Sequence, residues 1–173
     1  KVATVSSDNT KEIKIVLVFE NDTIKVSYIF WAKNGAMSFD IYNKLNVPLY
    51  FDWKKSAFIP IDKMMSYWQD ETNTVGVSTS SAYYLYGGVI SGNNKSKSKS
   101  IRQERVGALP PHSLISSNKY SLVPAKTSLP IQSFTLSNTP LRFRNFLAVS
   151  TSEQFDKDVF YIDNAFFVSS VKK

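Results

Sequence analysis

The sequence contains no cysteine and a single histidine, His112. Without cysteine the chain has no disulfide, no thiolate metal ligand and no cysteine nucleophile, although an oxidising compartment is still permitted. A mechanism that needs two histidines is excluded, and a Ser-His-Asp triad would have to use His112. Paired carboxylates at a recognisable spacing are absent too. The usual groups for general acid and base catalysis are therefore scarce, and the sequence predicts a non-enzymatic protein without a cofactor.

Long apolar runs are also missing. No stretch reaches about 18 uninterrupted apolar residues, so no transmembrane helix is expected. The chain has no internal repeat, and Gly87-Gly88 lacks both the spacing and the following helix of a phosphate-binding loop. The sequence begins at Lys1 without methionine or a visible signal peptide. We expect a processed form whose signal peptide was removed upstream.

The composition is that of a globular protein rich in aromatic residues. The 173 residues are 43% hydrophobic and 20% charged, enough for one domain with a core. Nine tyrosines and twelve phenylalanines favour strands over helices. The net charge of +7 suits nucleic acid, anionic lipid or an acidic polysaccharide. Because the lysines are scattered through predicted loops and strand ends, solubility is the simpler interpretation.

Alternating apolar and polar residues organise the chain around Ile41–Ile61. The alternation covers residues 37–42, breaks at a turn with Asn46 and Pro48, and restarts over 49–53. A third short extended run ends at Pro60, and Trp53 is predicted to be a core aromatic. The stretch thus predicts a strand, a turn and two more extended segments.

Further strands surround this frame. Asn34-Gly35 is a strong hairpin signal, and residues 61–70 favour a short helix or an irregular loop. The last segment, residues 159–171, is predicted as two extended pieces about a turn at Asp163-Asn164. The other predicted strands include Lys11–Phe19, Ile24–Trp31, Tyr83–Ile90 and Leu141–Ser150.

Many short strands between turn residues predict an all-β antiparallel β-sandwich with at most one short helix, and a barrel is the alternative. Residues 1–10 are polar and small, and we expect a flexible N-terminal tether there. Residues 11–173 form a single predicted sandwich domain. Its hairpin tip at residues 91–100, SGNNKSKSKS, is expected to be flexible because no apolar residue anchors it.

Several short motifs resemble a family of uncharacterised bacterial envelope proteins, mostly predicted lipoproteins. These residues are Tyr42-Asn43, Pro48–Trp53, Lys55–Ile59, Pro110–Ser113, Arg144–Phe146 and Val159–Val171. The resemblance covers most of residues 40–171 and implies an immunoglobulin-like sandwich in the cell envelope, that is, outer membrane-associated, periplasmic or on the surface. The family carries a lipid-modified cysteine upstream; this sequence has no cysteine, so anchoring by a lipid is left open. The resemblance implies no activity.

Three aromatic residues are candidates for stacking on sugar rings, because they are predicted to lie off the main apolar face of their strands: Trp31, Tyr84 and Tyr86. Packing inside the protein is the alternative for all three. The densest basic stretch comprises Lys95, Lys97, Lys99, Arg102 and Arg105. No aromatic residue lies between its lysines, so we do not expect nucleic acid as a partner.

Two other sets of polar residues have weaker claims to function. His112 precedes Ser113, but neighbouring residues of a strand point to opposite faces, so a nucleophile pair is not expected. Glu153, Asp156, Asp158 and Asp163 cluster in sequence without the spacing of a calcium-binding loop, and we predict no metal site. The sequence therefore predicts an envelope protein with a structural or binding role, and a carbohydrate-binding module is the alternative. Envelope glycans or another envelope protein are the expected partners.

Overall fold

The computed structural model describes residues 2–13, 16–32, 36–68, 73–79, 83–85, 88–90, 95–101, 104–122 and 129–173. The chain divides into two compact units, one of residues 1–68 with 105–173 and one of residues 69–104. Every regular element within the described ranges is a strand, which confirms the prediction of an all-β fold. None of these residues belongs to a helix that could cross a membrane.

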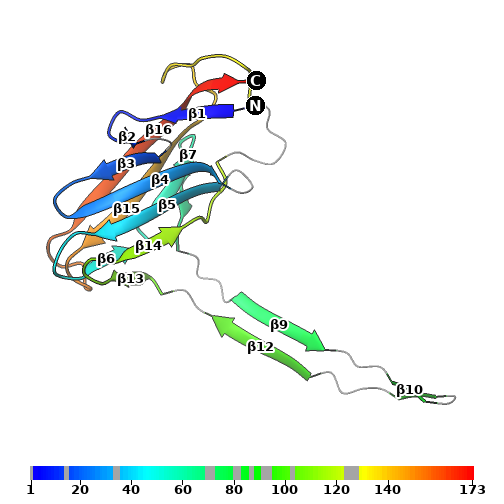
Figure 1. The fold of residues 1–173 in the computed structure, drawn as a ribbon. Coiled ribbons are helices and arrows are strands. Elements are labelled where there is room, and N and C mark those ends of the chain that lie inside the picture. Colours follow the sequence, from blue (N-terminus) through cyan, green and yellow to red (C-terminus); the bar gives the residue numbers. More distant parts are fainter. Residues whose placement is uncertain are drawn as a thin grey trace. The chain divides into compact units, whose positions relative to one another are not determined.

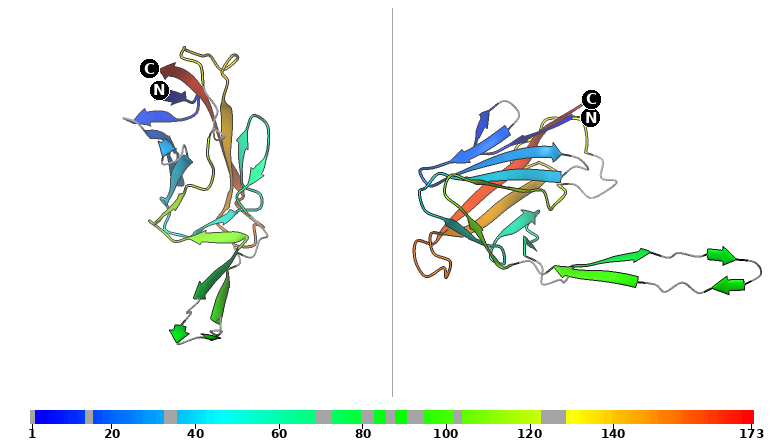
Figure 2. Two further views of the ribbon diagram at one scale, coloured as in Figure 1. Left: turned by 90° about the vertical axis from the view of Figure 1, so that its right-hand side faces the viewer. Right: turned by 60° about the horizontal axis from the view of Figure 1, so that its bottom comes forward.

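The first unit is a sandwich of two antiparallel sheets (Figures 1 and 2). The larger sheet has seven strands in the order β1-β16-β15-β6-β13, with β7 paired to β15 and β8 paired to β7. These strands are β1 (Val2–Ser6), β6 (Leu49–Asp52), β7 (Ala57–Pro60), β8 (Met65–Ser66), β13 (Val106–Leu109), β15 (Arg142–Ser150) and β16 (Phe160–Lys172).

The smaller sheet has five strands in the order β14-β5-β4-β3-β2. They are β2 (Lys11–Ile13), β3 (Val16–Glu20), β4 (Ile24–Ala32), β5 (Ala36–Asn43) and β14 (Leu114–Ser117). Figure 2, in its left view, shows the two sheets as separate layers. Across the described part of the chain the sheets do not close on each other, so the sandwich is confirmed and the barrel is not.

The core lies between the layers and follows the alternation seen in the sequence. Met37, Phe39 and Ile41 of β5 are each at most 1% exposed, and the succession of β5, β6 and β7 matches the predicted segments. Burying each of these side chains contributes roughly 1.5–3 kcal/mol relative to leaving it in water. Trp53 packs against the same core, as predicted. Strand β13 ends at Leu109, directly before Pro110.

A buried group of polar side chains joins the two sheets, and we call Tyr28, Asn145 and Asn164 the polar clasp. The hydroxyl oxygen of Tyr28, from β4, accepts hydrogen bonds from Asn145 Nδ2 of β15 at 3.0 Å and from Asn164 Nδ2 of β16 at 2.9 Å. Asn145 Oδ1 accepts a third bond from the Tyr67 hydroxyl at 2.7 Å. All three clasp residues are completely buried. The clasp therefore fixes one sheet against the other at its middle.

The clasp also explains why the predicted turn at Asp163-Asn164 is wrong. Residues 160–172 form one continuous strand, and Asn164 lies directly opposite Asn145 in the β15–β16 pair. Asp-Asn is a common turn dipeptide, because both side chains can bond to their own backbone. Here the Asn164 amide bonds to Tyr28 instead, and this tertiary partner outweighs the local preference.

The N-terminal region also differs from its prediction. Residues 2–6, expected in a flexible tether, form β1 and pair with β16, and Val5 enters the core at 8% exposure. The predicted single strand Lys11–Phe19 is a hairpin instead, since Lys11 pairs with Val18 and Ile13 with Val16. Strand β3 continues into a β3–β4–β5 meander, and its middle strand β4 matches the predicted strand Ile24–Trp31. The Asn34-Gly35 turn falls outside the described residues.

Residues 61–66, part of the segment expected as a helix or loop, contain a turn and the short strand β8, which pairs with β7. Pairing with β7 uses the backbone groups that a helix would have bonded internally.

The described residues of the second unit form two antiparallel strand pairs. Strand β9 (Asn73–Thr79) pairs with β12 (Lys95–Ile101), and β10 (Tyr83–Leu85) pairs with β11 (Gly88–Ile90). The predicted single strand Tyr83–Ile90 is thus two strands that pair with each other. Of the predicted flexible tip at 91–100, residues 95–100 belong to β12, and residues 91–94 lie outside the described ranges. The predicted domain limits of 11–173 remain a prediction.

Candidate functional site

The outer face of the seven-stranded sheet carries an exposed aromatic pair. Tyr161 of β16 is 56% exposed and stacks on Phe146 of β15, with ring centroids 5.4 Å apart and ring planes 20° from parallel. Leu147 and Ile162, their neighbours in sequence, are buried between the sheets. Because side chains alternate along a strand, burial of these neighbours turns Phe146 and Tyr161 outward.

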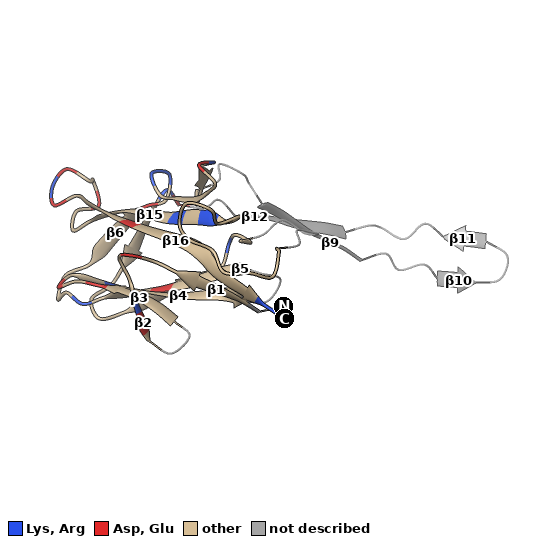
Figure 3. Ribbon diagram, turned by 90° about the horizontal axis from the view of Figure 1, so that it is seen from above, with Lys and Arg blue, Asp and Glu red and all other residues tan. Residues whose placement is uncertain are grey.

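Ion pairs flank the two rings. Arg144 of β15 donates from Nε to Asp163 Oδ1 of β16 at 2.9 Å, and its second hydrogen bond goes to Oδ2 of the same carboxylate. The bond to Asp163 raises the pKa of the Arg144 guanidinium. Further along the strand, Arg142 pairs with Asp62 at 2.7 Å. Figure 3 shows basic residues in blue along β15. We call Phe146, Tyr161, Arg144 and Asp163 the aromatic platform.

The platform combines a flat apolar surface with fixed polar groups. The exposed ring of Tyr161 offers a face for stacking, and Phe146 supports it from the neighbouring strand. The Arg144–Asp163 pair adds hydrogen-bond donors and acceptors at the edge of the rings. Both charged side chains remain partly exposed, at 45% and 39%. A ligand with an apolar ring face and peripheral hydroxyl groups matches this arrangement.

The three predicted stacking residues occupy different surroundings. Trp31 is partly buried, adopts a positive φ of 62° and packs against the core. Tyr84 lies in β10, in the second unit, and Tyr86 lies outside the described residues. The platform residues Phe146 and Tyr161 were missed by sequence reasoning. The alternation around Leu147 and Ile162 indicates that Phe146 and Tyr161 point away from the core. Their exposure to solvent, however, depends on which other segments cover this face of the sheet.

The predicted basic stretch is divided between the two units. Lys95, Lys97 and Lys99 occupy alternate positions of β12, opposite Thr79, Val77 and Val75 of β9. Arg102 falls outside the described residues. Arg105 belongs to the first unit, where its guanidinium donates from Nε to Asp52 Oδ1 at 3.2 Å and from Nη2 to Oδ2 at 2.7 Å.

Asp52 gives Arg105 a structural role. Its carboxylate is 1% exposed and also accepts the backbone N–H of Lys54 at 3.1 Å. Burial alone would raise the pKa of Asp52, but the hydrogen bonds from Arg105 and from the Lys55 backbone outweigh burial, and the pKa is lowered. The ionised pair holds the end of β6 against the start of β13. There the backbone N–H of Trp53 donates a hydrogen bond to the backbone carbonyl of Arg105 at 2.9 Å.

The side chains of His112 and Ser113 form hydrogen bonds with different partners. The His112 ring nitrogen Nε2 lies 2.8 Å from Asn46 Oδ1, in a turn where the backbone has a φ of 51°. The Ser113 hydroxyl donates to the Pro110 carbonyl at 2.6 Å. His112 thus ties its turn to the segment that contains Asn46, and Ser113 closes its own turn internally.

The acidic C-terminal residues are likewise engaged separately. Asp156 accepts a hydrogen bond from Ser152, Asp158 accepts one from Thr151, and Asp163 pairs with Arg144. Among the residues that the structure describes, no three acidic or histidine side chains are grouped as metal ligands would be.

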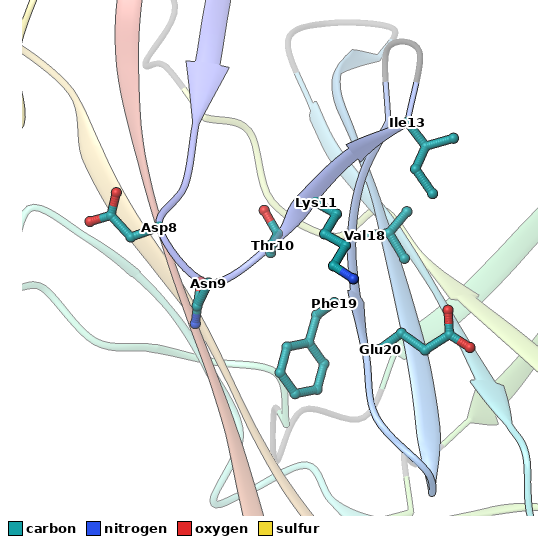
Figure 4. Close-up of a pocket in the computed structure, with 8 residues that line it drawn as sticks. All are labelled: Asp8, Asn9, Thr10, Lys11, Ile13, Val18, Phe19 and Glu20. Carbon is teal, nitrogen blue, oxygen red and sulfur yellow. The ribbon is translucent and has the colours of Figure 1, made fainter.

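Two hollows lie near the N-terminal strands. One, of about 460 Å³, lies on the β2–β3 hairpin, and Figure 4 shows Lys11, Val18 and Glu20 grouped there, with Asp8 pointing away from them. Glu20 is engaged by Lys44 at 2.9 Å, a bond that lowers its pKa. The other, of about 300 Å³, lies between β1 and β2 and includes Trp31 in its lining.

A polar hollow of about 390 Å³ lies on the outer face of the five-stranded sheet, around Tyr42 and Asp40. The Asp40 carboxylate accepts a hydrogen bond from Ser116 at 2.6 Å. Among the residues described on this face, the hollow contains one aromatic residue and no stacked ring pair occurs, so the face offers less to a ring-shaped ligand than the aromatic platform does.

Comparison with known proteins adds nothing to this geometry: no family model, no curated protein and no solved structure matches the chain.

Proposed function

We propose that this chain is a non-enzymatic binding domain of a bacterial cell envelope, and that its aromatic platform binds the sugar rings of an envelope glycan. Within this proposal the sandwich is immunoglobulin-like, as in the envelope lipoprotein family that the sequence resembles. The chain works outside the cytoplasm, either free or tethered by a lipid anchor that precedes Lys1.

One observation carries the proposal: the Tyr161 ring is more than half exposed and yet stacks on the ring of Phe146. Large apolar side chains on a monomer surface usually occur singly, and a stacked pair on a flat sheet needs an explanation. Tyrosine and arginine are the residue types that dominate binding surfaces, since they offer contact area together with a polar group. A ring held by strand pairing loses little conformational entropy when a ligand binds, which favours affinity.

The platform also has a suitable polar rim. Sugar hydroxyl groups both donate and accept hydrogen bonds. Arg144 supplies only donors and Asp163 only acceptors, so the pair can satisfy both kinds of contact. The two side chains already bond to each other, and part of their order is therefore present before a ligand arrives.

Binding is tested by affinity gel electrophoresis and calorimetry with soluble polysaccharides and peptidoglycan fragments. Tyr161→Ala is expected to weaken binding at least about tenfold, corresponding to about 1.4 kcal/mol. Tyr161→Phe keeps the ring and should retain most of the affinity. Tyr42→Ala is the matched control, because it removes a tyrosine from the outer face of the other sheet. If no glycan is retained, or if Tyr161→Ala and Tyr42→Ala bind alike, the proposal is wrong.

The location is tested separately by the sequence encoded upstream of Lys1. A signal peptide that ends in a lipid-acceptor cysteine would support an anchored envelope protein. A start codon directly before Lys1 would contradict it.

A further inference from the structure

The polar hollow on the outer face of the five-stranded sheet brings opposite charges close together without joining them. It has a volume of about 390 Å³, which is at the lower end for sites that hold a small organic molecule. Strands β3, β4, β5 and β14 and the residue that follows β5 all contribute to its lining, which includes Glu20, Lys25, Asp40, Tyr42, Lys44 and Leu114. The hollow thus combines charged, aromatic and aliphatic groups on a surface built by strand pairing.

The register of the strands sets the order of the side chains in the hollow. Lys25 of β4 lies opposite Tyr42 of β5, and Tyr42 lies opposite Leu114 of β14. Asp40 precedes Tyr42 by two positions, and Ile41 between them is completely buried, so Asp40 and Tyr42 share the outer face. Tyr42 therefore has a cation on one neighbouring strand, an aliphatic side chain on the other, and a carboxylate next to it on its own strand.

Lys25 and Asp40 are oppositely charged neighbours that do not pair. They stand diagonally across the β4–β5 pair, because Asp40 lies opposite Ser27, two positions from Lys25. Diagonal neighbours are about 7–8 Å apart, within reach of a long side chain. Even so, the described part of the chain shows no ion pair or hydrogen bond for the Lys25 ammonium group. Asp40 accepts one bond, from the Ser116 hydroxyl to Oδ1 at 2.6 Å, which leaves Oδ2 available.

The remaining groups of the hollow divide into an engaged polar side and an apolar side. Lys44 already donates to Glu20 at 2.9 Å and to the Asn21 carbonyl at 2.7 Å. Of the two lysines that line the hollow, Lys25 is therefore the one that remains for a ligand. Leu114, at the other side, is 56% exposed and can cover the hydrocarbon part of a bound molecule.

We propose that the polar hollow binds a free α-amino acid with an apolar side chain. The carboxylate of the amino acid pairs with Lys25, and its ammonium group pairs with Asp40 Oδ2. The apolar side chain lies over Tyr42 toward Leu114. An amino acid suits the hollow better than a simple anion, because it supplies a counter-charge to both side chains at once, whereas an anion alone is repelled by Asp40. The site lies on the other sheet from the aromatic platform and does not depend on glycan binding.

Titration with L-leucine, followed by the backbone amide signals in ¹H–¹⁵N NMR, tests the proposal. Two analogues keep the leucine side chain and each lack one charge: leucine amide has no carboxylate, and isocaproic acid has no amino group. Leucine should shift the amide signals of residues 25–27 and 40–42 in a saturable way. Each analogue should bind about three- to tenfold more weakly, since a partly exposed ion pair is lost.

Two variants assign the charges of the ligand to their partners. Lys25→Met should bind leucine and leucine amide alike, because the partner of the carboxylate is gone. Asp40→Asn should bind leucine and isocaproic acid alike, for the corresponding reason. Lys63→Met, which removes an exposed lysine outside the hollow, and Tyr161→Ala should leave the affinity for leucine unchanged.

The proposal is overturned if leucine causes no saturable shift, or if the wild type binds isocaproic acid as tightly as leucine. It is also overturned if Lys25→Met keeps the full affinity for leucine and still prefers leucine to leucine amide. The amide spectrum of each variant shows directly that it is folded, so a loss of binding is not confused with unfolding.

Discussion

Replacing Tyr28 by phenylalanine tests how strongly the polar clasp holds the two sheets together. The change removes one oxygen atom and keeps the ring, which packs on Phe166 at a centroid distance of 4.7 Å. The lost oxygen accepts hydrogen bonds from both Asn145 and Asn164. Because all three residues are completely buried, water cannot replace the missing acceptor.

The expected cost follows from the two donors left behind. A buried donor that loses its partner costs about 1–3 kcal/mol, so Tyr28→Phe should destabilise the protein by about 2–6 kcal/mol. This is a large part of the roughly 5–15 kcal/mol that a typical domain has in total. With a urea m-value of about 2 kcal/mol/M, the midpoint of unfolding should fall by about 1–3 M.

Urea unfolding followed by circular dichroism measures this change. Tyr161→Phe is the control, since it removes a hydroxyl from an exposed tyrosine and should change the stability by less than about 0.5 kcal/mol. In a double-mutant cycle, Tyr28→Phe and Asn164→Leu should cost less together than the sum of the single changes, because they share one hydrogen bond. A loss below about 0.5 kcal/mol for Tyr28→Phe would refute the assigned role of the clasp.

Tyr28 should also affect how the stability of the protein changes with pH in alkali. Burial raises the pKa of Tyr28 and of Tyr67 above the ordinary tyrosine value of 10.0. The unfolded chain therefore ionises first, and the stabilisation is complete below pH 10 and is lost as the pH rises above it. The slope of stability against pH above 10 should be shallower in Tyr28→Phe than in the wild type.

Two further variants test other contacts of the large sheet. Because the pKa of Asp52 is lowered in the folded protein, its contribution to stability is present above pH 3.8 and is lost as the pH falls below that value. Asp52→Asn should therefore reduce the loss of stability in acid, measured as a stability–pH profile. An unchanged loss of stability in acid would argue against the ion pair with Arg105. A Cβ atom on Gly107 would lie 2.5 Å from Trp53 Nε1. Gly107→Ala should therefore lower the free energy of unfolding by about 1–3 kcal/mol, measured by urea unfolding. An equal loss in a Trp53→Phe background would exclude the clash with the indole as its cause.

The alternation of apolar and polar residues predicted the strands in which one face is buried in the core. Strand β5 and the first half of β15 were predicted well because their buried residues, such as Phe39 and Ile41 or Phe143 and Asn145, lie two positions apart. The same pattern failed at Asn164, where a polar residue fills an inward position. Its burial depends on Tyr28, which is 136 positions away in the chain, and no local rule contains that partner.

The candidate binding surfaces were harder to predict than the fold. The outward direction of Phe146 follows from the burial of Leu147, but whether another segment covers it is decided by tertiary structure. Trp31 was chosen as a residue off the main apolar face of its strand. In the structure Trp31 lies at a shift in the register of the β4–β5 pair and packs against the core. A one-residue irregularity of pairing is enough to change the face of a side chain, and the sequence does not mark it.

The arrangement of the clasp links stability to binding. Asn145 lies between Arg144 and Phe146 on β15, and Asn164 directly follows Asp163 on β16. The inner faces of these two strands are therefore held by Tyr28 at the same positions whose outer faces carry the platform. Loss of the clasp should loosen the strand pair beneath the rings before the sandwich unfolds. Tyr28→Phe is accordingly expected to weaken glycan binding even under conditions where the protein stays folded, although Tyr28 itself lies in the opposite sheet.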